Sequence, residues 1–317
     1  MEVPADGSYL LMLVIAACTN RKRKPIPGSL YASALPRAPI AEIASEWAAH
    51  LSAAADVFPA RDIYGGRSFQ EALHAAALLD ARLIIVSAGL GLVSAEKRVP
   101  PYACTVLVNA PDSIASRVLG DYSVASWWQA ISGASPFSQS LASAVSSTDR
   151  LICAALSDAY IEMIAGDLSA LPAEVLARLR LFTRAPLERV APALRPFVMP
   201  YDDRLDGPDS PVRGTRGDFA GRALHHFAKH VVGEGDGRSV DEHRAAVKLA
   251  ISSWRMAVQF DRQRLDDAAV LNLIREHWDA ERGSATRLLR RLRDDLGVAC
   301  EQARFADLAR RVRGEKA

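Results

Sequence analysis

Short polar segments in the first third of the chain contain the residue types that could do chemistry. They offer thiol, hydroxyl, amide and phenol groups, which can hydrogen-bond a phosphate, a sugar or the polar edge of a nucleobase. Glycines in the same segments would let a ligand approach the backbone closely. We therefore predict a pocket built from Cys18, Thr19, Asn20, Tyr64, Gly65, Ser87, Gly89 and Tyr102.

Basic residues form a second set, concentrated near the end of the chain. Positions 281–317 contain ten lysines and arginines but six acidic residues. A guanidinium group presents a fork that matches two phosphate oxygens. A solvated helical hairpin would also account for the pattern, but the residue types favour a helix-turn-helix-like element on DNA, with helices over 284–296 and 300–312. The expected DNA contacts are Lys22, Arg213, Arg216, Arg287, Arg290, Arg291 and Arg293.

Alternating strands and helices must position these groups. Three apolar runs have the continuous Val, Ile and Leu content of strands buried in a parallel sheet, namely Leu11–Ala17, Arg82–Ser87 and Arg150–Leu156. Helical spacing of apolar residues falls between the first two, over 38–55 and 68–80. The chain is therefore expected to have an α/β fold with a layered core around a parallel sheet. Ligands of such sheets lie beyond the carboxyl ends of the strands, here in loops that begin at positions 18, 87 and 157.

The rest of the chain is expected to be mostly helical. A helix is predicted from Pro172 to about Phe182, followed by an extended stretch over 192–201. The polar run 202–217 has the composition of an interdomain linker, although paired acids and spaced arginines are unusual in a linker. These features predict an α/β pocket domain over 1–200 and a loop with a helical DNA-binding region over 201–317.

Composition excludes several other classes of protein. With 50% hydrophobic and 24% charged residues, the chain is neither disordered nor collagen-like. A net charge of +2 requires any polyanion site to be a local patch. The four cysteines are widely spaced, which argues against disulfides and structural zinc, and the pair His226 and His230 lacks an evident third metal ligand. We therefore expect neither a metal nor a cofactor.

Apolar content also bears on where the protein works. The longest apolar run, Leu10–Cys18, is far shorter than the roughly 18–20 residues that cross a bilayer. The run ends like a lipoprotein signal, but Glu2 and Asp6 stand where such a signal is positively charged. A cytoplasmic protein is expected, with no membrane contact and no obligate protein partner.

Four short motifs in the first 110 residues add a resemblance. They are CTNRK at 18–22, LYAS at 30–33, SAGLGLV at 87–93 and PPY at 100–102. This part of the chain resembles bacterial proteins distantly related to the YaaA-like peroxide stress family and to a domain of archaeosine synthase. One departure is Ala103, which replaces the acid that usually follows Pro-Tyr. That group is associated with DNA binding, modified nucleobases and phage defence. The overall layout is also similar to that of anti-phage DNA glycosylases that excise glucosylated hydroxymethylcytosine.

The residues and the resemblance together predict excision of a modified base from double-stranded phage DNA. Such an enzyme flips the nucleotide into a pocket, and the departing base leaves an oxocarbenium-like sugar that a carboxylate can stabilise while it orients a water. The expected catalytic residues are Asp62 and Asp218, with Asp202 and Asp203 as alternatives. Asp62 adjoins the ring of Tyr64, which could stack on the flipped base. A transglycosylase or nucleoside-processing enzyme and a non-catalytic DNA-binding regulator remain as alternative functions.

Overall fold

The computed structural model describes residues 12–146, 149–233, 236–258 and 261–316. The chain divides into two compact units, unit 1 (Met1–Ala257) and unit 2 (Val258–Ala317). Leu11, the first residue of the first predicted strand, lies outside the described residues, as do positions 1–10. Within the described ranges, no helix is both long enough and apolar enough to cross a membrane.

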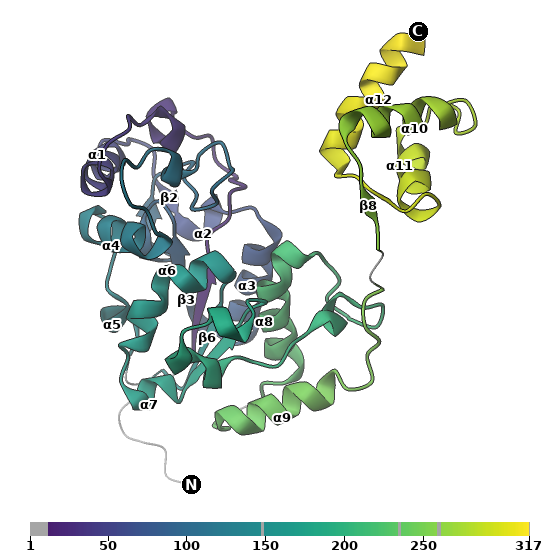
Figure 1. Cartoon of the computed structure of the whole chain (residues 1–317). Helices are drawn as coiled ribbons and strands as arrows, with labels where there is room; N and C mark the ends of the chain where they lie inside the picture. Colours follow the sequence, from purple (N-terminus) through teal and green to yellow (C-terminus); the bar gives the residue numbers. More distant parts are fainter. Residues whose placement is uncertain (1–11, 147–148, 234–235, 259–260, 317) are drawn as a thin grey trace. The chain divides into compact units, whose positions relative to one another are not determined.

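A five-stranded sheet in the order β4-β3-β1-β6-β7 forms the centre of unit 1 (Figure 1). Its parallel strands are β1 (Met12–Ala17), β3 (Ala81–Ser87), β6 (Leu151–Ala155) and β7 (Leu179–Phe182). At the edge beside β3, β4 (Gly91–Ser94) runs antiparallel. Val14 of β1 lies in register between Leu83 and Cys153 on its two neighbours. The predicted α/β fold with a mostly parallel sheet is therefore confirmed.

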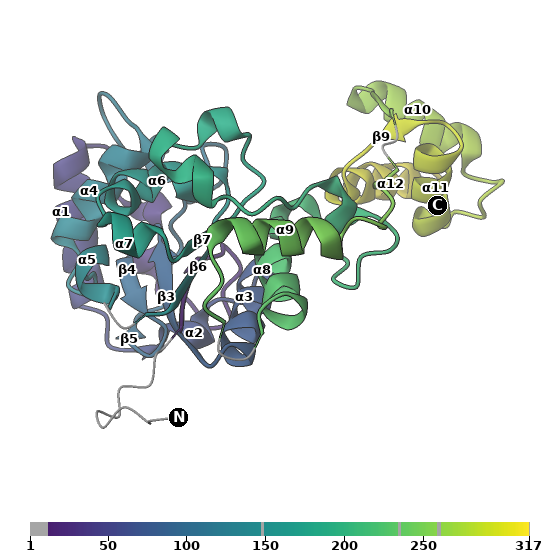
Figure 2. The same ribbon diagram turned by 90° about the horizontal axis from the view of Figure 1, so that it is seen from below.

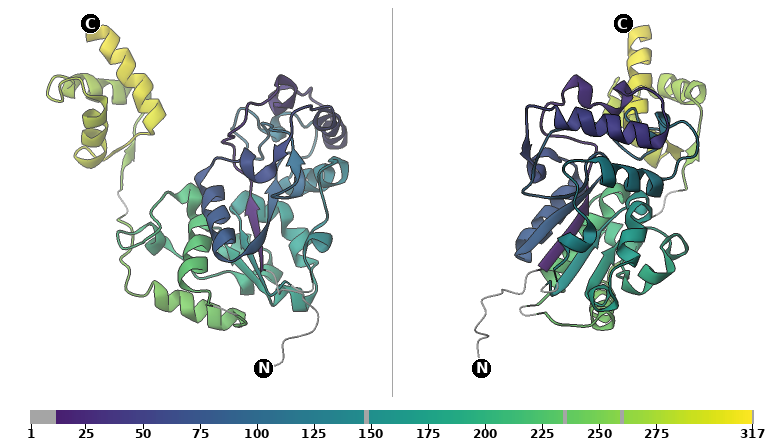
Figure 3. Two further views of the ribbon diagram at one scale, coloured as in Figure 1. Left: turned by 180° about the vertical axis from the view of Figure 1, so that it is seen from behind. Right: turned by 90° about the vertical axis from the view of Figure 1, so that its left-hand side faces the viewer.

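Two groups of helices cover opposite sides of this sheet (Figures 1 and 2). In the first group, α3 (Arg67–Leu78) and α8 (Phe219–His230) lie side by side and contact the four parallel strands. In the second group, α4 (Val124–Ala134) packs against both α1 (Ile40–Ser52) and α6 (Asp158–Ser169). Each helix buries apolar residues three or four positions apart, so both groups join the sheet in one continuous core. Figure 3 shows these layers from two further directions.

Shorter elements complete unit 1. The helix α9 (Val240–Ala250) begins at a capping box, in which the side chains of Ser239 and Glu242 bond each other's backbone amides. Two-residue strands β2 (Phe58–Pro59) and β5 (Arg98–Val99) pair antiparallel. The remaining short helices are α2 (Ala60–Ile63), α5 (Leu141–Ala144) and α7 (Ala173–Leu176).

Unit 2 has a small hydrophobic core of its own. Its helices are α10 (Asp267–His277), α11 (Ala285–Asp294) and α12 (Gln302–Lys316), which bury a separate cluster of apolar side chains. Strands β8 (Gln263–Arg264) and β9 (Val298–Ala299) pair parallel. The predicted helix pair around Gly297 is present, with β9 between its members, and Gly297 adopts the left-handed φ of 62° that suits glycine.

Two predictions for the middle of the chain are wrong. Leu179–Phe182 is the edge strand β7 and not the end of a helix, which stops at Leu176. Pro192–Phe197 is a 3-10 helix and not an extended stretch. The strand escapes a search for apolar runs because Arg180 interrupts it. This arginine is nevertheless buried, since its guanidinium donates to His243 Nδ1 at 2.8 Å and to three backbone carbonyls.

The polar segment 202–217 folds as part of unit 1 and does not link two domains. Arg222 of α8 is fully buried. Its guanidinium group donates to three backbone carbonyls within the segment 202–217 and to the carboxylates of Asp206 and Asp218. The turns of the segment therefore converge on one guanidinium group. The division between the two units accordingly falls after Ala257 and not after position 200, where the sequence placed it.

Candidate functional site

The carboxyl ends of the parallel strands meet at one edge of the sheet, where the predicted pocket segments also lie. Cys18 follows β1, Ser87 ends β3 and Ser157 follows β6. Thr183, which follows the unpredicted strand β7, joins them. This edge is where open α/β sheets bind their ligands.

A buried network of hydrogen bonds connects several predicted pocket residues. The hydroxyl of Tyr102 lies 2.6 Å from Ser87 Oγ and 3.1 Å from the hydroxyl of Tyr64. Cys18 Sγ lies 3.0 Å from the hydroxyl of Tyr160. Burial raises the pKa of all three tyrosines well above its ordinary value, so they remain neutral. Because the ring of Tyr64 is fully buried, it does not present a face on which a flipped base could stack, and that expectation is corrected.

Lys22 lies against this network and is not a surface DNA contact. Its Nζ is 4.7 Å from the centre of the Tyr102 ring and 5.2 Å from that of Tyr64. The same ammonium donates a hydrogen bond of 2.7 Å to the carbonyl of Thr19. Burial lowers the pKa of Lys22. The aromatic faces partly replace the water that the cation has lost.

A cavity of about 130 Å³, here called the lysine cavity, opens beside this ammonium group. Asp112 lies in its wall, where Oδ1 accepts hydrogen bonds from the hydroxyl of Ser33 at 2.8 Å and from its amide at 3.3 Å. These two bonds hold the carboxylate in one orientation. The wall is formed by Asn20, Lys22, Ala103, Cys104, Thr105, Ala110, Pro111 and Asp112.

Two further cavities at the same edge, of about 170 and 420 Å³, are here called the arginine cavities because both are lined by Arg184 and Arg216. Arg184 follows β7 and pairs with Asp203 at 2.5 Å and Asp206 at 2.7 Å, which offset its charge, whereas Arg216 is exposed. The first turns of α3, α6 and α8 line the smaller cavity. Guanidinium groups and helix N-termini both favour anions, so this space suits a phosphate.

The loop 18–22 separates the lysine cavity from the smaller arginine cavity. Thr19 lines the arginine cavity and Asn20 lines the lysine cavity. Thr19 Oγ1 accepts a hydrogen bond of 3.1 Å from the amide of Gly66, the residue that precedes α3. A Cβ at Gly66 would lie 2.6 Å from the Thr19 side chain, so this contact requires glycine. A polar ring and a phosphate could therefore occupy neighbouring spaces on the two sides of one loop.

The two predicted pocket glycines serve the packing of the site. The amide of Gly65 donates to the carbonyl of Arg21 at 2.8 Å. The carbonyl of Gly89 accepts a hydrogen bond of 2.7 Å from Trp47 Nε1, and a Cβ at this position would lie 2.6 Å from the ring of Tyr102. Gly89 thus makes room for a tyrosine ring rather than for a ligand.

The structure does not bring the two predicted catalytic carboxylates together. Asp62 lies on the surface of α2, where 51% of its side chain is exposed. Its Oδ1 lies 3.9 Å from Arg61 Nε. Asp218 is buried and accepts hydrogen bonds from Arg222 Nε at 2.6 Å and the amide of Thr215 at 2.8 Å. Neither lines the lysine cavity. Of the alternatives, Asp202 binds Arg204 in a bidentate pair and Asp203 pairs with the arginine that follows β7.

The predicted DNA-binding arginines have different environments. Arg213 and Arg216 are exposed in unit 1, and Arg287 and Arg290 are exposed on α11 in unit 2. Two others support the fold of unit 2: Arg291 pairs with Glu281 at 3.1 Å, and Arg293 donates to the carbonyl of Cys300 at 2.7 Å. Unit 2 also has a basic hollow of about 480 Å³, lined by Arg262, Arg264, Arg293, Ala299, Cys300, Glu301 and Arg304.

Asp112 and Arg184 were not among the predicted site residues. Arg184 could not be placed because the strand before it was predicted to be helical. Asp112 does not follow a predicted strand, so no pattern in the sequence marked it. It lines the same cavity as Ala103.

Comparisons with known proteins give no independent assignment. No family model matches the chain, and it matches neither a curated protein nor a solved structure. The function therefore has to be inferred from the chemistry of the site itself.

Proposed function

We propose that the protein is a DNA glycosylase that excises a modified cytosine, glucosylated hydroxymethylcytosine, from phage DNA and leaves an abasic site. The observation that carries the proposal is the lysine cavity, in which an amine, a carboxylate and an amide from Lys22, Asp112 and Asn20 share one small space at the carboxyl edge of the sheet. An enzyme that removes a base needs these three functions: base recognition, water activation and a proton for the leaving group.

The size and polarity of the lysine cavity suit one flipped ring. Its volume of about 130 Å³ is many times the roughly 10–15 Å³ that one water molecule needs by the same measure, so the cavity can accept a group larger than water. Asn20 offers both a donor and an acceptor to the edge of a base. The glucose of a modified cytosine would project from the cavity toward solvent. We therefore place the pyrimidine ring inside and its sugar substituent outside.

Hydrolysis follows from the two charged side chains of this cavity. The carboxylate of Asp112 takes a proton from a water molecule, whose oxygen forms the new bond to C1′ of the deoxyribose. The bond between C1′ and the base breaks, and the protonated Lys22 gives its proton to the departing base. Asp112 also stabilises the oxocarbenium-like sugar. We assign this role to Asp112 because Asp62 lies on the surface and Asp218 is committed to Arg222.

Exposed arginines are suited to holding the DNA. The smaller arginine cavity borders the loop 18–22, so Arg216 and the first turns of three helices are suited to a phosphate next to the flipped nucleotide. Arg213 is exposed close to it in the chain. In unit 2, Arg287 and Arg290 would contact further phosphates, which position a protein on DNA without reading its sequence.

The proposal is tested by incubating the full chain with duplex DNA that contains cytosine, hydroxymethylcytosine or its glucosylated form. Released bases are identified by mass spectrometry and abasic sites are counted by alkaline cleavage. We expect release from the glucosylated duplex, a loss of about 10²–10⁴-fold in rate for Asp112→Asn, and no loss for the control Asp62→Asn, which alters a carboxylate on the surface.

Three results would contradict the proposal in different ways. DNA binding without release of any base would favour the DNA-binding regulator. Exchange or transfer of a free base, with no requirement for duplex, would favour a transglycosylase or nucleoside-processing enzyme. Full activity of Asp112→Asn together with loss in Asp62→Asn would return the catalytic role to the surface carboxylate.

A further inference from the structure

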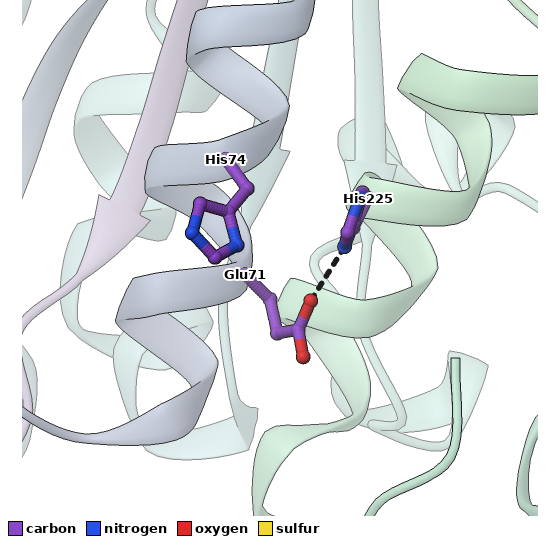
Figure 4. Close-up of side chains that lie close together, drawn as sticks. All are labelled: Glu71, His74 and His225. Atoms are coloured by element: carbon purple, nitrogen blue, oxygen red, sulfur yellow. Dashed lines mark hydrogen bonds and ion pairs between the residues drawn. The ribbon is translucent and has the colours of Figure 1, made fainter.

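A group of metal-ligating side chains lies between α3 and α8, outside the cavities described above. Glu71 and His74 stand on α3, and His225 faces them from α8 (Figure 4). Their candidate ligand atoms all lie within 4.8 Å of one another. His225 Nδ1 is already 2.5 Å from Glu71 Oε2, and the rings of His74 and His225 are 5.9 Å apart between centroids.

We propose that Glu71, His74 and His225 bind a Zn²⁺ ion that joins α3 to α8. Zinc takes two histidine nitrogens and one carboxylate oxygen, with water in the fourth position of a tetrahedron. The spacing of three residues between Glu71 and His74 brings both side chains to one face of a helix. The proposal does not depend on glycosylase activity.

The observed separations are close to those that zinc needs. Ligand atoms on one tetrahedral zinc ion lie about 3.3–3.6 Å apart, because each bond measures about 2.0–2.2 Å. The atoms here lie within 4.8 Å of one another, so side-chain rotations that move them by about 1 Å would bring them onto one ion. The backbone need not move, since the two helices are already in contact: a Cβ at Gly221 would lie 2.2 Å from the carbonyl oxygen of Ser68.

The surroundings of the cluster support an ion with one open position. Arg67 Nε lies 3.2 Å from Glu71 Oε1, and this second contact orients the carboxylate, as outer contacts commonly do for metal ligands. His74 is exposed and lines a wide hollow of about 770 Å³ on the same side of unit 1. The fourth ligand would therefore be a water molecule reached from solvent.

The site has a consequence for the rest of unit 1. The first turns of α3 and α8 line the smaller arginine cavity, and the metal ligands stand one to two turns further along each helix. A zinc ion would hold these two walls at a fixed separation. The ligands do not line the lysine cavity, so the ion would take no part in the hydrolysis proposed there.

Zinc binding is measured on the untagged full chain, because a histidine tag would itself bind zinc. The protein is stripped with a chelator, dialysed against Zn²⁺ alone, and analysed by mass spectrometry for metal content and by competition with a chromophoric chelator for affinity. The variants are His74→Ala and His225→Ala, with His230→Ala as control. His230 is exposed on the same helix as His225 and lies outside the cluster.

We expect one equivalent of zinc in the wild type and in the control, and an affinity at least tenfold weaker in both cluster variants. Cobalt substituted for zinc should show the visible bands of tetrahedral Co²⁺, and zinc should raise the melting temperature of the wild type but not that of His74→Ala. Because His74 is exposed, its replacement should leave the fold intact, which circular dichroism verifies. Zinc below a fifth of an equivalent in the wild type, equal retention by every variant, or loss confined to His230→Ala would overturn the proposal.

Discussion

The ammonium group of Lys22 lies 4.7 Å from the centre of the Tyr102 ring, on the inner side of the loop that follows β1. The lysine is therefore held between an aromatic surface and a small polar cavity. Among the described residues no carboxylate forms an ion pair with this ammonium group, which is held instead by the two rings and by the carbonyl of Thr19. Chemistry at this edge of the sheet should depend on the charge of one side chain.

Base release should decline at alkaline pH when Lys22 loses its proton. Burial lowers its pKa from the ordinary 10.5, so the decline should begin at a lower pH than a free lysine would give. Replacement by glutamine should slow release by about 10²–10⁴-fold. The measurement is the single-turnover rate across neutral and alkaline pH. An unchanged pH profile in Lys22→Gln would remove the lysine from the mechanism.

Asp236 should make stability depend on acid pH. Burial alone would raise its pKa, but hydrogen bonds from Arg238 and His243 outweigh this effect and hold the pKa of the carboxyl below the ordinary 3.8. The ionised group therefore stabilises the folded state above pH 3.8, and this contribution is lost as the pH falls below that value.

The variant Asp236→Asn isolates that contribution. It should lower the free energy of unfolding at neutral pH by about 1–3 kcal/mol, because the buried carboxylate loses its charge-assisted hydrogen bonds from Arg238 and His243, while Arg238 itself is one-third exposed and can be solvated. Its stability should then fall less steeply than that of the wild type below pH 3.8. Urea unfolding at several pH values measures both effects, and parallel curves for the two proteins would contradict the prediction.

Two glycine-to-alanine replacements in helices should have opposite effects. At Gly221 of α8 the new Cβ would meet the Ser68 carbonyl oxygen at 2.2 Å, so the two helices must separate. We expect a loss of about 1–3 kcal/mol or more. Gly166 lies within α6, and a Cβ there would have no other atom within 4 Å. Alanine at this position should therefore stabilise the folded protein by about 0.5–1 kcal/mol. Thermal unfolding compares the pair, and equal shifts would show that helix packing does not limit stability at Gly221.

Arg287 and Arg290 should contribute to DNA affinity through phosphate contacts. Replacing each with glutamine should reduce the salt dependence of binding by about 0.9 in log–log slope, uniformly across DNA sequences. Both side chains are exposed, so unit 2 should remain folded. Binding of fluorescent duplexes over a range of salt concentrations measures the slope. An unchanged slope in the double variant would place the DNA on another surface.

Regular elements with continuous apolar runs could be predicted from the sequence, and those that depend on buried charge could not. The predicted ends of the strands β1, β3 and β6 lie within a residue or two of their observed ends. The strand β7 was missed because Arg180 in its middle has the appearance of a surface residue. Its burial depends on His243, far away in the sequence, and local patterns do not reveal that partner.

Some residues of the candidate site could likewise be predicted from the sequence, and others could not. Positions at or directly after the ends of strands, such as Ser87 and Cys18, could be assigned to one edge because parallel strands share their direction. Asp112 lies in irregular chain, and it reaches the lysine cavity through a bridge between Thr105 and Ser113. No periodicity marks such a loop. The ring of Tyr64 lies against Lys22, but its burial follows from packing that the sequence does not display.

The guanidinium of Arg222 makes the segment beside it a single cooperative unit. Leu205, Val212 and Thr215 all give their carbonyl oxygens to this one buried group. None of these turns can open while the others stay closed unless a buried donor is left without an acceptor. The backbone amides of the segment should therefore exchange their hydrogens slowly and together, at the rate at which the Arg222 side chain leaves the core.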